Sequence, residues 1–224
     1  MSLTKLKIKD NIKITQNDAL LIVDMQYDFM PGGSLPIKEG DKIIGLVNQL
    51  GEHFNKEKGI IILTQDWHPP NHLSFASNHP NKSPGEIYQS KGIGPVLWPD
   101  HCVQGTNGAS FHKNLRTDYA KKIFRKGIDS RTDSYSAFRD QLKDKETGLR
   151  EYLIIQNIKR VFICGLALDY CCYYTAMDGI EFSFDVFFII DATKGVDVPK
   201  GHISSAIKNM KKNGVKFVNN ESFQ

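Results

Sequence analysis

The chain has 224 residues, of which 40% are hydrophobic and 24% are charged. This length suits one domain with a full core, and this composition is that of an ordinary globular protein, which excludes a disordered, collagen-like or coiled-coil chain. The formal net charge of +4 comes from 29 basic and 25 acidic residues spread along the whole chain, so the sequence shows no basic stripe of the kind that binds nucleic acid.

The start of the chain, MSLTKLKIKD, carries charges but has no apolar segment behind them, so it does not read as a secretory signal. No run approaches the roughly 20 apolar residues that a membrane span needs. The four cysteines lack the paired CxxC spacing of a structural zinc site or a disulfide scaffold. We therefore expect one domain over residues 1–224, in the cytoplasm, where thiols stay reduced, with no nucleic-acid or membrane partner. Whether copies of the chain associate into a homo-oligomer stays open.

Short apolar runs predict six strands in chain order, at residues 19–24, 59–66, 121–127, 160–165, 184–192 and 215–218. The segments between them predict four helices, at residues 41–56, 147–157, 169–180 and 200–212. Continuous apolar runs are typical of strands buried on both faces, and alternation of strand with helix predicts right-handed crossovers. The predicted fold class is therefore α/β, a doubly wound and mainly parallel sheet with helices on both faces.

The interval from Trp67 to about Lys121 breaks this alternation. It is rich in proline, glycine, asparagine, serine and histidine and has little periodicity. Because a loop of this length is unusual inside a compact domain, we expect it to serve function.

Polar side chains follow four of the predicted strands, at the edge where open α/β sheets bind their ligands. In chain order, the residues expected at this edge are Asp24, then Asp66 with His68, then Lys126, and then the loop before Cys171. Taken alone, Asp24 can cap a turn and Lys126 can be a solvated lysine. Together they predict a site that combines an acid, a metal-binding pair, a base and a thiol.

Asp66 and His68 form a D-x-H pair, and His101 follows in the loop. Carboxylate and imidazole ligands suit zinc, manganese or iron, and three protein ligands leave positions open for water and substrate. We therefore expect one divalent metal ion. Nearby candidates for a fourth ligand or a supporting contact are His72, Ser74, His79 and Glu86.

The adjacent thiols of Cys171 and Cys172 differ in helical phase. In a helix that starts at Asp169, the residues at i, i+3, i+4 and i+7 that predict the buried stripe are Tyr173, Ala176, Met177 and Ile180. Cys171 then points nearly opposite that stripe, whereas Cys172 lies beside it. Asp169 is a good N-cap residue, which puts Cys171 in the first helical turn, where the helix dipole lowers a thiol pKa and backbone N–H groups can hold an oxyanion. Cys164 and Cys102 are predicted to be packed thiols.

Five segments in order carry a family resemblance: ALLIVDMQYDFMPGGSLPI, LTQDWHPPNHLSFAS, WPDHCVQGT, RKGIDSRTDSYSAF and VFICGLALDYCC. Together they closely resemble the nicotinamidases of the isochorismatase-like superfamily of cysteine hydrolases, and the resemblance runs through nearly the whole chain. One departure is Leu168, where the family often has threonine. The resemblance implies a three-layer, Rossmann-like α/β/α fold.

The resemblance also implies roles for individual residues. The implied catalytic triad is Asp24, Lys126 and Cys171. The implied metal ligands are Asp66, His68 and His101, with Ser74 as a further ligand, direct or through water, and zinc as the expected ion ahead of manganese or iron. The implied substrate-binding residues are Phe29, Trp98 and Tyr135 around a pyridine ring, with Gln26 near the triad. A cis peptide bond between Leu166 and Ala167 is expected to direct the backbone amides of Ala167 and Cys171 toward an oxyanion.

The expected activity is hydrolysis of nicotinamide to nicotinate and ammonia through a thioester on Cys171, in NAD salvage, with pyrazinamide as a second substrate. Three alternatives stay open from the residues. One is another amidase of the same family. A second is a metal-binding redox sensor that uses the pair of Cys171 and Cys172, and a third is a hydrolase in which a metal ion activates water.

Overall fold

The computed structural model describes residue 8 and residues 11–223 of the chain. These residues form a six-stranded sheet in the order β3-β2-β1-β4-β5-β6, and every neighbouring pair of strands is parallel. The strands are β1 Asp18–Val23, β2 Ile60–Asp66, β3 Ala120–Lys126, β4 Arg160–Leu166, β5 Asp185–Lys194 and β6 Lys216–Val218. The strand order reverses between β1 and β4, which is the position where doubly wound sheets bind their ligands.

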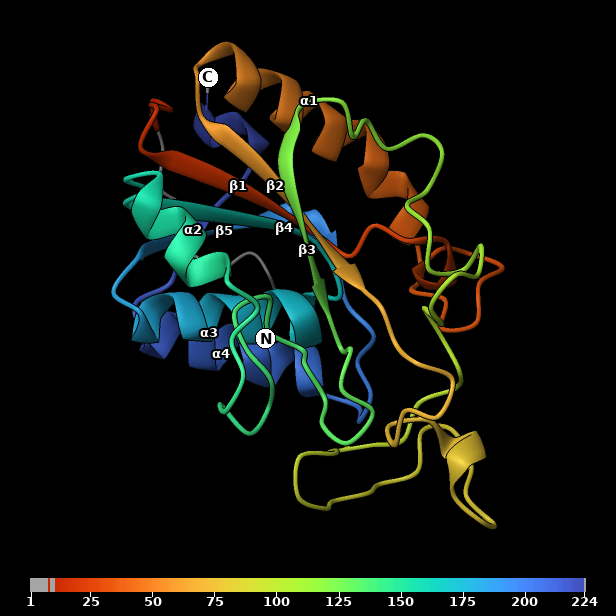
Figure 1. Cartoon of the computed structure of the whole chain (residues 1–224). Coiled ribbons are helices and arrows are strands. Elements are labelled where there is room, and N and C mark those ends of the chain that lie inside the picture. The colour runs from red at the N-terminus through yellow and green to blue at the C-terminus, as the bar shows by residue number, and fades with distance from the viewer. Residues whose placement is uncertain (1–7, 9–10, 224) are drawn as a thin grey trace.

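The α-helices of the described chain are α1 Ile44–Lys56, α2 Leu149–Ile155, α3 Tyr173–Glu181 and α4 His202–Lys212. Figure 1 shows α1 on one face of the sheet and α3 with α4 on the opposite face. Helix α2 packs against the edge strand β3, where the ring of Tyr152 lies 5.7 Å from the ring of Phe124. The predicted doubly wound α/β class is confirmed. Among the described residues, no helix combines the length and the apolar character that crossing a membrane requires.

The central strands are buried on both faces, as their continuous apolar sequences predict. All six residues of β1 are buried, and six of the seven residues of β4 are buried. The face of α1 that meets the sheet contributes Phe54, whose ring lies 5.2 Å from that of Phe162 in β4. Burial of such large side chains stabilises each helix on the sheet by about 1.5–3 kcal/mol per residue.

The helix predicted at residues 169–180 differs from the prediction at its start. It begins with a π-helical turn, Leu168–Cys172, and continues as α3. From Cys172 onward, the buried residues of the segment are Cys172, Thr175, Ala176, Asp178 and Gly179. Of the predicted stripe only Ala176 is buried, whereas Tyr173, Met177 and Ile180 are partly buried at the edge of the core. The rest of the prediction fails because the π turn shifts the helical phase and because a threonine and a glycine take core positions that an apolar pattern cannot reveal.

Asp169 is not the N-cap of this helix. The cap position of the π-helical turn is Ala167, and the Asp169 side chain makes no capping hydrogen bond. Its carboxylate instead accepts hydrogen bonds from the backbone N–H groups of Val196 and Asp197, each at 2.9 Å. Asp169 therefore joins the start of the helix to the loop after β5.

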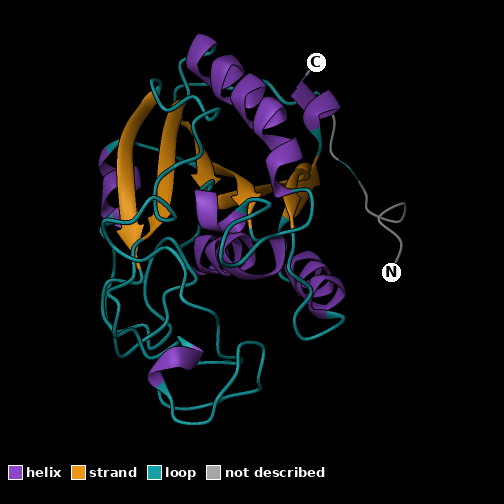
Figure 2. Cartoon of the chain, turned by 90° about the vertical axis from the view of Figure 1, so that its right-hand side faces the viewer, coloured by secondary structure: helices purple, strands orange, loops and turns teal. Residues whose placement is uncertain are grey.

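The segment between β2 and β3 covers the carboxyl ends of the strands. Its only regular helix in the structure is one short 3-10 turn, Ala76–Asn78, and single bridges pair Phe75 with Trp98 and His68 with Val103. Figure 2 shows these loops gathered beyond the strand ends. The long loop therefore lies where the sequence predicts the ligand site.

Candidate active site

Four side chains from four strand ends meet at the edge of the sheet, as predicted. Asp24 follows β1, Asp66 ends β2, Lys126 ends β3, and Cys171 lies in the turn after β4. Their exposed fractions are 0%, 4%, 2% and 6%, in that order. The parallel topology brings all four carboxyl ends to one edge, which is why residues up to 147 positions apart in the chain share one buried site.

The ammonium group of Lys126 is the centre of this site. Its Nζ lies 2.9 Å from Oδ2 of Asp24, 3.0 Å from Oδ1 of Asp66 and 3.3 Å from Sγ of Cys171. Lys126 donates hydrogen bonds to Asp66 and Cys171, whereas its contact with Asp24 is an ion pair that leaves Oδ2 of Asp24 without a hydrogen bond among the described residues. Burial opposes the charge of Lys126, but the two carboxylates hold its pKa well above the ordinary value. Lys126 is therefore a buried cation and not a solvated lysine.

The pKa values of Asp24 and Cys171 are both raised from their ordinary values. Burial raises the pKa of Asp24, although Lys126 lowers it in part, and Thr64 Oγ1 donates a hydrogen bond of 2.6 Å to Oδ1 of Asp24. Burial raises the pKa of the Cys171 thiol well above its ordinary value. The charge of Lys126 lowers this pKa, but the nearby carboxylates of Asp24 and Asp66 raise it and so oppose Lys126. The prediction that the helix start lowers this pKa is wrong, because burial beside two acids dominates. The thiol must therefore lose its proton during the reaction, to a base within reach.

Cys172 has no exposed surface, and burial raises its pKa well above the ordinary value too. Cys102 and Cys164 are likewise buried, and all four thiols are free. The contact with Lys126 therefore separates Cys171 from the other cysteines.

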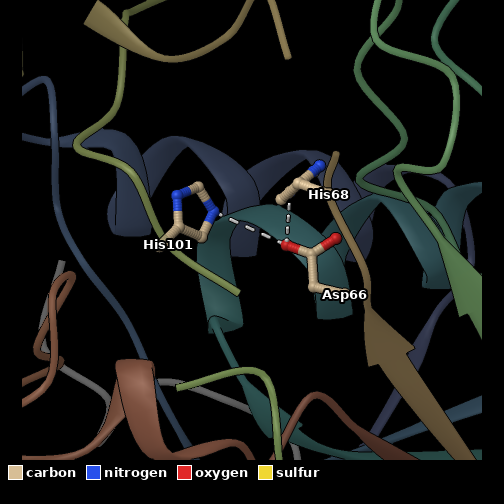
Figure 3. Close-up of side chains that lie close together, drawn as sticks. All are labelled: Asp66, His68 and His101. Carbon is tan, nitrogen blue, oxygen red and sulfur yellow. Dashed lines mark ion pairs between the residues drawn. The ribbon is translucent and has the colours of Figure 1, made fainter. Parts of the chain in front are cut away.

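Asp66, His68 and His101 form a cluster whose ligand atoms all lie within 4.8 Å of one another (Figure 3). Oδ2 of Asp66 lies 3.0 Å from Nε2 of His68 and 3.6 Å from Nε2 of His101. Burial raises the pKa of Asp66, but electrostatic attraction to His68 and Lys126 is stronger and places this pKa well below its ordinary value.

The outer hydrogen bonds of the two histidines test whether this cluster fits a metal ion. Nδ1 of His68 lies 2.9 Å from the carbonyl oxygen of Gly127, and Nδ1 of His101 lies 2.8 Å from that of Pro99. A carbonyl only accepts, so each Nδ1 carries the hydrogen, and in the neutral ring each Nε2 presents a lone pair toward Asp66. Three acceptors that face one another fit a divalent cation between them, and backbone-held histidines are the usual arrangement around such an ion.

The fourth-ligand candidates occupy different places. Ser74 lines the cavity beside the cluster. Its hydroxyl lies 2.7 Å from Nδ1 of His72, whose Nε2 lies 3.2 Å from the carbonyl oxygen of Thr132. The carbonyl requires a hydrogen on Nε2, so Nδ1 accepts from Ser74 and the serine oxygen keeps its lone pairs for the cavity. His79 and Glu86 instead make contacts with Leu73 and Lys82 on the exposed loop, away from the cluster.

The expected aromatic residues surround one cavity with the thiol and the cluster. Phe29, Trp98 and Tyr135 all line it. Ala167 lines it too, and the expected cis peptide bond between Leu166 and Ala167 is confirmed. Gln26 is not among the residues that line it. Its side chain donates to the carbonyl oxygen of Asp66 at 2.8 Å and accepts from the N–H of the same residue at 2.8 Å, so Gln26 fixes the backbone of Asp66 instead.

Residues 18–222 of the chain match the family model described as the isochorismatase domain. The chain belongs to the isochorismatase family. The nicotinamidase of Acinetobacter baylyi is 42% identical over 94% of this chain and 96% of its own length. PnC1 from L. infantum, solved in complex with nicotinate, is 34% identical with a TM-score of 0.82, covering 95% of this chain and 98% of its own. The pyrazinamidase of Pyrococcus horikoshii, solved in complex with zinc, is 37% identical with a TM-score of 0.74, covering 91% and 99%. The resemblance to nicotinamidases is confirmed.

Five further residues of this isochorismatase-family chain line the cavity although no sequence pattern indicated them: Leu35, Asp133, Ser134, Tyr170 and Val196. Two of them could have been found from the sequence, because Tyr170 is adjacent to Cys171 and Asp133 lies in one of the segments similar to nicotinamidases. No sequence pattern marks Val196, because it lies in the loop after β5, which a hydrogen bond to Asp169 holds at the cavity.

Proposed function

We propose that the chain is a nicotinamidase, which hydrolyses nicotinamide to nicotinate and ammonia in NAD salvage, in the cytoplasm. The observation that carries the proposal is the contact of Lys126 with both Asp24 and Cys171, beside a three-residue metal cluster and inside an aromatic cavity. Relatives named nicotinamidase, 42% identical over almost their full length, support the same activity. Pyrazinamide, an amide of similar shape, is proposed as a further substrate, because one relative is named pyrazinamidase.

The reaction needs a nucleophile and an acid, because a primary amide is a poor electrophile and its nitrogen must be protonated to leave. Asp24 accepts the proton of Cys171 as Sγ attacks the carboxamide carbon. Lys126 stabilises the negative charge that moves between the thiol and the carboxylate. The oxyanion that forms on the carboxamide oxygen is held by the backbone amides of Ala167 and Cys171.

Asp24 then gives its proton to the departing nitrogen, so that the C–N bond breaks, ammonia leaves and a thioester remains on Cys171. In the second half, Asp24 takes a proton from a water molecule that attacks the thioester carbon. The C–S bond breaks, the proton on Asp24 returns to Cys171, and nicotinic acid leaves and releases its own proton to solvent to become nicotinate. Atoms and charges balance with water as the only added reactant.

Asp66, His68 and His101 would hold one divalent ion, with Ser74 as a further ligand directly or through water. Zinc is proposed ahead of manganese or iron, because nitrogen and carboxylate ligands suit it and a relative was solved with zinc. When bound, this ion supplies a Lewis acid to which the pyridine nitrogen of the substrate can attach. Phe29, Trp98 and Tyr135 orient the flat ring, so that its carboxamide points to Cys171.

The test compares Cys171→Ala with Cys172→Ala in ammonia release from nicotinamide. Cys172 is a matched control, because it is adjacent to Cys171 and is also a free, buried thiol. Loss of the nucleophile should lower kcat by at least about 10³-fold, as in other covalent hydrolases, whereas Cys172→Ala should keep kcat within several-fold. Comparable loss in both variants, with metal content and unfolding midpoint unchanged, would remove the assignment of Cys171.

Mass spectrometry of the protein quenched during turnover separates this mechanism from direct attack by metal-activated water. A nicotinoyl adduct on the peptide that contains Cys171 supports the thioester. Turnover at the normal rate with no adduct under rapid quench, together with an active Cys171→Ala variant, would favour the metal-activated water.

A further inference from the structure

Asp133 is a buried acid on the cavity that the proposed reaction does not use. It is 2% exposed and lines the cavity together with Trp98 and Tyr135. Among the described residues, no side-chain hydrogen bond joins it to Lys126 or to the metal cluster. Any role of Asp133 must therefore act through its hydrogen-bond partners, Gly94 and Tyr135.

The carboxylate of Asp133 ends a short chain of hydrogen bonds that runs into the cavity wall. Oδ2 accepts from the backbone N–H of Gly94 at 3.0 Å and from the hydroxyl of Tyr135 at 3.3 Å. The same hydroxyl accepts from Nε1 of Trp98 at 3.0 Å and also lies 3.1 Å from the carbonyl oxygen of Gly94. Because a tyrosine hydroxyl has one hydrogen, its orientation depends on which of these two acceptors it meets.

This chain of hydrogen bonds fixes two aromatic walls relative to each other. The indole of Trp98 and the phenol of Tyr135 meet through one oxygen atom, and the ring of Tyr170 packs against both, at 4.9 Å from Trp98 and 5.1 Å from Tyr135. The backbone of Trp98 is held separately, by an N–H to the carbonyl of Ser74 at 2.8 Å. The indole of Trp98 is thus held by Tyr135, whose hydroxyl has two acceptors, Asp133 and the carbonyl oxygen of Gly94.

We propose that Asp133 is a positioning residue, which acts through the hydroxyl of Tyr135 to hold the Trp98 and Tyr135 walls of the cavity at the separation that accepts a flat aromatic amide. The inference rests on the proposed function, because that function assigns the cavity between Trp98 and Tyr135 to aromatic amides. It places Asp133 in substrate binding and leaves the bond-making steps to Asp24, Lys126 and Cys171.

The experiment measures KM and kcat for nicotinamide in Asp133→Asn, Asp133→Ala, Tyr135→Phe and the double variant Asp133→Ala with Tyr135→Phe. Asparagine keeps an oxygen that can accept from Gly94 and Tyr135, so its KM should stay within about twofold of wild type. Alanine removes the acceptor and should raise KM about 3- to 10-fold, with kcat within about threefold, as expected for the loss of one buried hydrogen bond. Because the two residues act in one chain, the double variant should be no worse than the worse single variant.

Three kinetic outcomes would overturn the proposal. Effects that add in the double variant would show that Asp133 does not act through Tyr135. A loss confined to kcat would show a role in the chemical step. An Asp133→Asn variant as impaired in KM as Asp133→Ala would show that the charge itself meets the substrate.

A spectroscopic readout separates failure of this inference from failure of the proposed function. The chain has two tryptophans, so a Trp67→Phe background leaves Trp98 as the sole indole reporter. Its emission should shift in Asp133→Ala and in Tyr135→Phe but not in Asp133→Asn, whatever the substrate is. Unchanged emission in all three variants would overturn the positioning role, whereas an inactive wild-type protein that shows the expected shifts would count against the proposed function alone.

Discussion

Replacing Asp133 by asparagine should change how the stability of the protein depends on pH. Burial raises the pKa of Asp133 from 3.8 to about 7, with the nearby charge of Asp66 adding to the effect. The folded state therefore binds this proton more tightly than the unfolded state. Asp133 thus contributes stability at low pH that is lost as the pH rises through about 4 to 7. Asparagine is neutral throughout and removes this dependence.

The magnitude follows from the size of the shift. A difference of about three pKa units corresponds to about 4 kcal/mol as an upper value, at about 1.4 kcal/mol per unit. Between pH 5 and pH 8, the free energy of unfolding of Asp133→Asn should therefore rise relative to wild type by about 2.5 kcal/mol. The difference should level off above about pH 8, where wild-type Asp133 is ionised in both states.

The assay is denaturant unfolding of both proteins at half-unit pH steps after treatment with a chelator. Chelation matters because a divalent ion at Asp66 adds positive charge nearby and lowers the pKa of Asp133. The variant keeps an acceptor for Gly94 and Tyr135, so the packing contribution is matched. Two unfolding curves that stay parallel from pH 5 to pH 8 would refute the reasoning, since they would mean that Asp133 binds its proton equally in both states.

Three further predictions concern the site around the thiol and the cluster. Lys126→Met should lower the free energy of unfolding by about 3–5 kcal/mol in denaturant titration, because two buried carboxylates lose their shared cation, and it should abolish ammonia release. His101→Ala should purify with less zinc than wild type by elemental analysis, because one of the three cluster ligands is gone. Gly127→Ala should weaken zinc binding about 10- to 100-fold in a competition titration, because the added Cβ would lie 2.3 Å from the ring of His68 and turn it away from the cluster. Full zinc affinity in that variant would show that the ring has room to adapt.

Most of the fold could be predicted because its signals are local. Strands buried on both faces need unbroken apolar runs, and the crossover helices need their own length of chain, so the six strands and four helices can be read from the order of the segments. The edge of the sheet that carries the site follows as well, because parallel strands all end there. Asp24, Asp66, Lys126 and Cys171 meet for that reason.

The expected cap at Asp169 and the expected pKa of Cys171 were wrong because each depends on partners far away in the chain. Asp169 looks like a local cap, but its hydrogen bonds go to residues 27 and 28 positions later. The hydrogen bonds of Gln26 to the backbone of Asp66, 40 positions away, were likewise not visible in the local sequence. The thiol pKa of Cys171 depends on burial and on two carboxylates from other strands, and those effects exceed the local helix dipole.

The sequence by itself determined the α/β class, the strand ends that carry the chemistry and the family, because apolar runs, strand order and short motifs are written along the chain. Only the tertiary structure decided which side chains act on one another. It decided that Lys126 bridges Asp24 and Cys171, that the cluster histidines present Nε2, and that Asp133 supports the aromatic walls. The physical reason is that hydrogen-bond direction, burial and charge are properties of neighbours in space, and here those neighbours come from segments far apart in sequence.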